Sequence, residues 1–113
     1  MNIQRGDIFM AQLGEQPDGS IQAGYRPVIV CSNNMANRYS TVITVIPLTS
    51  RRKKDLPTHT YLKVCGLTSK FSVALCEQIL SINKYKLQKR IGTIRNTVYE
   101  EQIKRAIEIQ LDL

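Results

Sequence analysis

The sequence predicts a mainly β protein with some helix, in which a small antiparallel β-barrel of short strands ends in a C-terminal helix. Runs rich in Val, Ile and Thr recur at short intervals over the first two-thirds of the chain, and turn-forming residues separate them. No helical pattern lies between these runs, which argues against alternating strand–helix units with a parallel sheet. Near residue 97 the period changes, and apolar residues begin to recur every three or four positions.

The first two strands are expected on either side of a long loop. Residues 7–13 have the apolar positions of a half-buried strand. Residues 14–24 contain three Gly and one Pro, which predicts a mobile loop. Residues 27–31 form a continuous apolar run of the kind that is buried on both faces.

The next segment is expected to turn and then to form a second central strand. Asn33, Asn34 and Asn37 have the turn chemistry of a loop. Residues 41–48 are again rich in Val, Ile and Thr. We expect this strand to stop at Pro47, because proline removes a donor from the ladder of hydrogen bonds.

Two further strands are expected beyond residue 57. In residues 58–64, small and apolar side chains alternate with a second set that includes His59 and Tyr61, which predicts one buried and one outward face. Residues 65–66 indicate a turn. Residues 72–82 predict one last strand.

A helix is expected from about residue 98. Thr97 and Glu100 have the spacing of a capping box, in which the threonine hydroxyl accepts from the third helical amide and the glutamate reaches back to the Thr97 amide. One apolar face follows at helical spacing, and we expect it to pack on the barrel. The residues of this face are Tyr99, Ile103, Ala106, Ile107 and Leu111.

Length and composition indicate one domain, residues 1–113, with an ordinary folded core. The N-terminus has polar residues where the apolar part of a secretion signal would lie, and no apolar run is long enough to span a bilayer. We therefore expect a cytoplasmic protein with no membrane partner. Three scattered cysteines and one histidine form no ligand cluster, so no metal or other cofactor is expected.

The net charge of +7 favours a polyanionic partner such as nucleic acid. Only Arg5 and Arg26, of sixteen basic residues, fall in the first thirty positions, whereas four follow consecutively at residues 51–54. Such a run is most often a solvated loop, but it can also grip phosphate groups.

Six segments, in this order and at these spacings, resemble the MazF/PemK family of toxin–antitoxin endoribonucleases. They are residues 5–8 (RGDI), 24–30 (GYRPVIV), 33–38, 45–50 (VIPLTS), 56–59 (LPTH) and 75–79 (LCEQI). No single segment is specific for the family, but the shared order and spacing of all six in a chain of this length are specific.

The resemblance implies a twisted SH3-like barrel with a C-terminal helix that assembles as a homodimer. Members of this family cut single-stranded RNA, usually mRNA at a short recognition sequence, without a metal. They leave a 2′,3′-cyclic phosphate and a 5′-hydroxyl. A cognate antitoxin binds the dimer through a segment that folds on contact and blocks the RNA groove. Matched by position, the family's active-site arginine and threonine are Arg26 and Thr49.

These two residue types suit metal-free RNA cleavage, in which the 2′-hydroxyl is the nucleophile. Arg26 offers a planar fork of donors to phosphate oxygens, and Thr49 offers a hydroxyl. Guanidinium is a poor base, so His59 and Glu77 are the candidates for accepting a proton. Glu77 could instead orient Arg26 or form a structural ion pair, and His59 could be inert.

RNA contacts are expected from a tyrosine, from the basic run with the serine before it, and from a glutamine in the last matching segment. The candidates are Tyr25, Ser50, Arg51, Arg52, Lys53, Lys54 and Gln78. Aromatic rings stack on unpaired bases, although packing is the commoner role of a tyrosine. The basic side chains would bind phosphates.

Two other functions remain as alternatives. Toxins of the same fold poison DNA gyrase and cut nothing, but they lack the arginine–threonine pairing. An SH3-like module that binds nucleic acid or protein would leave RNA intact. Hydrolysis by a cysteine–histidine pair is less favoured, because the three cysteines and His59 form no recognisable arrangement.

Overall fold

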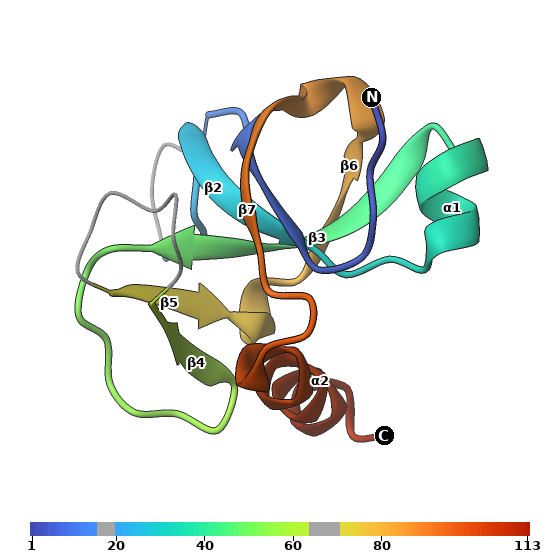
Figure 1. Cartoon of the computed structure of the whole chain (residues 1–113). Coiled ribbons are helices and arrows are strands. Elements are labelled where there is room, and N and C mark those ends of the chain that lie inside the picture. Colours follow the sequence, from blue (N-terminus) through green and yellow to red (C-terminus); the bar gives the residue numbers. More distant parts are fainter. Residues whose placement is uncertain (16–19, 64–70) are drawn as a thin grey trace.

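The computed structural model describes residues 1–15, 20–63 and 71–113 and consists of a bent antiparallel sheet with a helix packed against it (Figure 1). The elements of these ranges are β1 (Asp7–Gln12), β2 (Tyr25–Val30), α1 (Asn34–Tyr39), β3 (Val42–Thr49), β4 (His59–Leu62), β5 (Ser72–Leu75), η1 (Cys76–Gln78), β6 (Leu80–Asn83), η2 (Lys84–Lys86), β7 (Leu87–Thr93) and α2 (Val98–Leu111), where η marks a 3-10 helix.

The sheet has the order β4-β5-β3-β2-β1-β7, and β6 pairs with β3 beside this path. All pairings are antiparallel. The prediction of a mainly β, antiparallel, barrel-like fold with a C-terminal helix is confirmed, although the sheet is not a closed barrel. The strand β7 was not predicted, because its exposed charged residues hide the pattern of a half-buried strand.

The prediction of one strand over residues 72–82 is wrong, because η1 divides it into β5 and β6. Both strands pair with the same edge of β3. From Leu48 to Val45 β3 advances three residues, while the opposite chain advances six, from Ala74 to Leu80. The three residues of η1 take up this difference and turn Glu77 and Gln78 out of the ladder.

The prediction that the strand stops at Pro47 is also wrong, since β3 continues to Thr49. The amide of Cys31 donates to the carbonyl of Thr44, so by the alternation of an antiparallel ladder the Val28–Pro47 pair has no hydrogen bonds. The Pro47 nitrogen therefore points away from β2, to the edge where β3 changes partner from β6 to β5. No donor is needed there.

The asparagines at 33–37 form a helix start and not a plain loop, which corrects the expectation for this segment. Asn33 is the N-cap of α1, and its side-chain oxygen accepts from the amide of Ala36 at 2.9 Å. Asn37 is buried, and its side-chain nitrogen Nδ2 donates to the Ser32 carbonyl at 2.9 Å. The turn chemistry was recognised correctly, but here it caps six helical residues.

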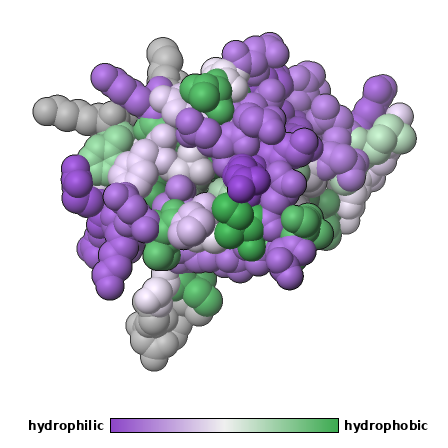
Figure 2. All heavy atoms as spheres, turned by 90° about the horizontal axis from the view of Figure 1, so that it is seen from below, coloured by the Kyte–Doolittle hydropathy of each residue, from purple (hydrophilic) through white to green (hydrophobic). Residues whose placement is uncertain are grey.

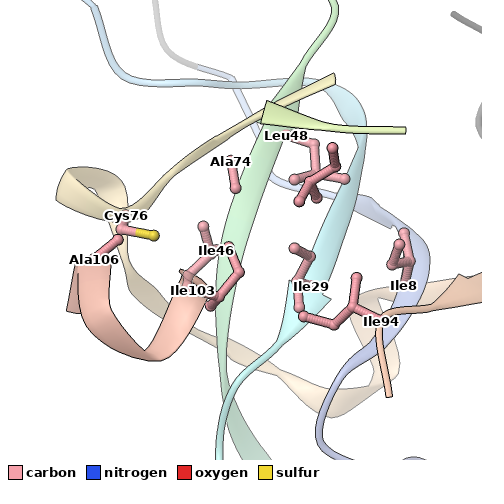
Figure 3. Close-up of a cluster of buried hydrophobic side chains, with 10 residues drawn as sticks. Ile8, Ile29, Ile46, Leu48, Ala74, Cys76, Ile94, Ile103 and Ala106 are labelled. Carbon is pink, nitrogen blue, oxygen red and sulfur yellow. The ribbon is translucent and has the colours of Figure 1, made fainter. Parts of the chain in front are cut away.

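The larger part of the core lies between the sheet and α2, where nine labelled side chains point toward one another (Figure 3). These residues are Ile8, Ile29, Ile46, Leu48, Ala74, Cys76, Ile94, Ile103 and Ala106. A second cluster on the other face of the sheet includes Phe9, Val28, Val30 and Val45.

The helix α2 begins at Thr97, as expected, but the cap differs from the predicted box. The Thr97 hydroxyl accepts from the Tyr99 amide at 3.2 Å and donates to the Ile94 carbonyl at 2.6 Å. The Thr97 amide also donates to Ile94, so it is not available to Glu100. The predicted apolar face packs on the sheet through Ile103 and Ala106, whereas Leu111 at its end is exposed.

The face of the molecule on the side of α2 is mostly hydrophilic, with separate apolar patches (Figure 2). In the described ranges, no helix is long and apolar enough to cross a membrane.

Candidate functional site

Arg26 and Thr49 are brought together by the register of β2 and β3. The ladder pairs Val28 with Pro47 and Val30 with Val45. Continued by two residues, the same register sets Arg26 opposite Thr49. Because side chains alternate along a strand, both residues lie on the face of Val28 and Val30, beyond the end of that apolar cluster. In Figure 1 the start of β2 and the end of β3 lie on the same side of the molecule.

Arg26 is half-buried, and its Nε donates to the Ala23 carbonyl at 3.0 Å. This bond orients the guanidinium and leaves its terminal nitrogens for another acceptor. No carboxylate within residues 1–15, 20–63 and 71–113 forms an ion pair with Arg26. A bound phosphate would therefore not compete with a protein anion in these ranges.

Thr49 is 2% exposed, and its Oγ1 accepts from the amide of Arg51 at 3.2 Å. The hydroxyl hydrogen is not used by this bond and can donate to a substrate oxygen. The basic segment, residues 51–54, begins at that amide. Arg51, Arg52 and Lys54 are exposed, and Lys53 is half-buried.

His59 is more buried than its outward position on β4 suggested, since its side chain is 4% exposed. Its Nδ1 lies 2.7 Å from the Lys54 carbonyl oxygen, and its Nε2 lies 2.7 Å from Glu77 Oε2. Both partners accept hydrogen bonds, so the cationic ring with two N–H donors satisfies both contacts. No ring nitrogen is left for a substrate hydroxyl.

The Glu77 carboxylate contacts the His59 ring and forms no ion pair with Arg26 in the described residues. Its second carboxylate oxygen accepts from the Thr58 hydroxyl at 3.1 Å. The structure therefore favours the ion-pair interpretation of Glu77 over an orienting role at Arg26.

Gln78, a predicted RNA-binding residue, contacts the end of the loop that precedes Arg26. Its side-chain oxygen accepts from the Gln22 amide at 2.7 Å, and its nitrogen donates to the Ser20 carbonyl at 2.9 Å. Residues 16–19 of the predicted mobile loop lie outside the described residues, so its mobility stays a prediction. The remaining candidates, Tyr25 and Ser50, are both exposed, each next to one member of the Arg26–Thr49 pair.

The sequence analysis placed Tyr61 on the outward face of its strand with His59 but did not predict its partner: the Tyr61 hydroxyl donates to the Lys53 carbonyl at 2.7 Å. The alternation of β4 places it on the same face as His59. That alternation was the available signal, but it does not reveal that the acceptor is the basic segment.

Cys31 and Cys76, the two cysteines in the described residues, do not contribute a nucleophile to this site. Burial is the main cause that raises the pKa of Cys31 to about 12, against a smaller lowering by Arg5. Burial likewise raises the pKa of Cys76 to about 12. Both thiols thus stay protonated near neutral pH. In the ranges described, no three His, Cys, Asp or Glu side chains gather as metal ligands.

Comparison with known proteins identifies one family over nearly the whole chain. Residues 4–111 match the model of the PemK-like, MazF-like toxin of type II toxin–antitoxin systems. A relative from Staphylococcus saprophyticus, named Endoribonuclease MazF, is 34% identical over 98% of this chain and 92% of its own length.

Solved structures of similar shape agree with this match. The Mycobacterium tuberculosis toxin MazF-mt6 is 27% identical, with a TM-score of 0.78 over 95% of this chain and 97% of its own. A mycobacterial endoribonuclease in complex with its cognate antitoxin is 23% identical, with a TM-score of 0.80 over 98% and 96% of the two chains. The second likeness supports the fold.

Proposed function

The chain belongs to the PemK-like, MazF-like family of type II toxin–antitoxin toxins, and on this premise we propose that it is a metal-independent endoribonuclease. The proposed substrate is single-stranded RNA, cut at a short recognition sequence. The observation that best supports the proposal is the register that sets Arg26 opposite Thr49, directly before the basic segment.

In the proposed reaction the 2′-hydroxyl attacks the neighbouring phosphorus. The bond from O2′ to phosphorus forms, the bond to O5′ breaks, the proton lost from O2′ passes to solvent and O5′ gains one, so the products are a 2′,3′-cyclic phosphate and a 5′-hydroxyl. Arg26 would stabilise the charge that develops on the phosphate oxygens and donate a proton or hydrogen bond to the departing O5′. Thr49 would donate its hydroxyl to a non-bridging oxygen.

His59 and Glu77 are not assigned the proton transfer from the 2′-hydroxyl. Both ring nitrogens of His59 and both oxygens of Glu77 already have protein partners. A base must reach the proton that it removes. The basic segment, together with Tyr25 and Ser50, would bind the RNA backbone and bases around the Arg26–Thr49 pair.

We also propose that the protein forms a homodimer and that a cognate antitoxin binds it. A chain of 113 residues buries a modest share of its surface, so a second subunit would add stability. The net charge of +7 favours an acidic antitoxin segment that competes with RNA.

Cleavage of a long single-stranded RNA in EDTA tests the proposed function. The purified protein, free of antitoxin, is compared with Arg26→Ala and Thr49→Ala, and the new RNA ends are mapped. Discrete cuts with 5′-hydroxyl ends, lost in both variants, are expected. Intact RNA from folded protein on several transcripts would instead favour a gyrase poison or a binding module.

A further inference from the structure

We propose that His59, Tyr61 and Glu77 are positioning residues that hold the basic segment in place beside Arg26 and Thr49. This inference rests on the proposed endoribonuclease function, in which the basic segment binds RNA phosphates. It replaces the acid–base role considered for His59 and Glu77 with a structural one that acts through residues 51–54.

The contacts from β4 are made to the backbone of the basic segment. Tyr61 donates to the carbonyl of Lys53, and His59 donates to the carbonyl of Lys54, both at 2.7 Å. The two donors are alternate residues of one strand, so they project from the same face. Neither lysine forms an ion pair in the described residues, so the charged ends of both are left for an anionic ligand.

Glu77, which lies in η1, holds the His59 ring that contacts the basic segment. Glu77 Oε2 lies 2.7 Å from Nε2 of the imidazole ring, so the carboxylate orients the ring whose Nδ1 faces the Lys54 carbonyl. Thr58 in turn donates to Glu77 and restricts its rotation. With the ring this deeply buried, the His59–Glu77 pair is shielded from solvent screening on the histidine side.

The other end of the segment is attached to the proposed site itself, because the Arg51 amide donates to Thr49. Arg52 lies with its guanidinium carbon 5.9 Å from the centre of the Phe71 ring, and that ring packs against Tyr61 at 5.8 Å. The basic segment therefore has contacts at each of its four residues. Its backbone is attached to Thr49 at one end and to β4 at the other.

A segment that is already held in place before RNA binds loses less conformational entropy on binding, so the free-energy cost of binding is smaller. Loosening it should thus weaken RNA binding, while the chemistry at Arg26 and Thr49 proceeds at nearly the same rate once RNA is bound. A catalytic role of His59 or Glu77 would give the opposite pattern, with turnover lost and binding kept.

The test compares Tyr61→Phe and Glu77→Gln with the wild type, and uses Tyr99→Phe as the matched control. Tyr61→Phe removes one hydroxyl and keeps the ring that packs on Phe71. Tyr99→Phe also removes one hydroxyl, but that hydroxyl accepts from the Lys63 amide, away from the basic segment.

Three quantities are measured for each protein. The first is the Kd for an RNA that contains the mapped cut site with a 2′-deoxy nucleotide at the attacking position, which prevents cleavage. The second is the pair kcat and KM for the cleavable RNA. The third is the initial rate of trypsin cleavage within residues 51–54, followed by mass spectrometry without RNA.

For Tyr61→Phe we expect Kd and KM to rise by about 2- to 10-fold, the worth of one hydrogen bond, with kcat within about twofold. Trypsin cleavage in the segment should accelerate by a similar factor. Glu77→Gln should do the same or more, and Tyr99→Phe should match the wild type.

Unchanged Kd, KM and trypsin rates in Tyr61→Phe and Glu77→Gln would overturn the proposal. A fall in kcat with unchanged Kd would also overturn it, since that result assigns the residues to the chemistry. If the wild type neither binds nor cuts RNA, the proposed function fails, and the trypsin rates still decide separately whether the segment is held.

Discussion

Replacing Thr49 with valine separates the chemistry of its hydroxyl from the shape of its side chain. Valine has nearly the same volume and branching, so at a position 2% exposed it leaves neither a cavity nor a clash. The variant loses the bond from the Arg51 amide, which costs about 1 kcal/mol. Arg51 is exposed, so water can take over that amide.

The expected effect on the reaction is much larger than the effect on stability. Loss of one donor to a developing oxyanion typically lowers kcat by about 10²- to 10³-fold, or about 3–4 kcal/mol. A domain stable by about 5 kcal/mol or more remains almost wholly folded after a loss of about 1 kcal/mol. Unfolding therefore cannot account for a hundredfold loss of activity.

The assay is single-turnover cleavage of the mapped RNA under saturating enzyme in EDTA, with urea unfolding of the same preparations. Thr49→Ser is the control, because it keeps the hydroxyl and loses a methyl group worth about 1 kcal/mol. We expect Thr49→Ser to stay within about tenfold of the wild type and Thr49→Val to fall far below it. Thr49→Val that cuts at the wild-type rate would refute the role of the hydroxyl, and so would equal losses in both variants.

Two further predictions concern the core. Ile103→Ala should lower the free energy of unfolding by about 2–4 kcal/mol, because Ile103 is 4% exposed between α2 and the sheet. Ile109 is 43% exposed, so Ile109→Ala should lower it by under about 1 kcal/mol. Both values are measured by urea unfolding, and similar losses in the two variants would contradict this packing. With their pKa raised from 9.0 to about 12, Cys31 and Cys76 in a Cys65→Ser variant should react with a maleimide at pH 8 about a thousandfold more slowly than an unburied cysteine. Unfolding returns these thiols to their ordinary pKa, so their contribution to stability is present below pH 9 and is lost as the pH rises toward 12. Labelling of the folded variant at the rate of an unburied thiol would show that burial does not protect them.

Local pattern was sufficient where a segment's own side chains decide its structure. The continuous apolar run predicted β2, with Val28 and Val30 buried, and the alternation of residues 58–64 predicted which side of β4 faces the core. Thr97 marked the start of α2, because a cap is formed within a few residues of itself. The resemblance to a family pattern likewise proposed Arg26 and Thr49 as site residues, which stays a prediction.

Local pattern failed where the outcome depends on partners from elsewhere in the chain. The division of residues 72–82 follows from the shared edge of β3, and the continuation through Pro47 follows from which side its nitrogen faces. Neither is recorded in the hydrophobic period of the segment itself.

The same distinction applies to the candidate site. Sequence by itself identified the residue types and proposed Arg26 and Thr49 by resemblance, but the register of β2 with β3, continued by two residues, is what sets them opposite each other across 23 positions of the chain. Only the tertiary structure shows the partners of His59, which has the right chemistry for a base. Its partners are a carbonyl five residues before it and a carboxylate eighteen residues after it, and only folding brings those acceptors to its two nitrogens. Hydrogen-bond partners across a sheet are a property of the register, whereas residue type and period are properties of the segment alone.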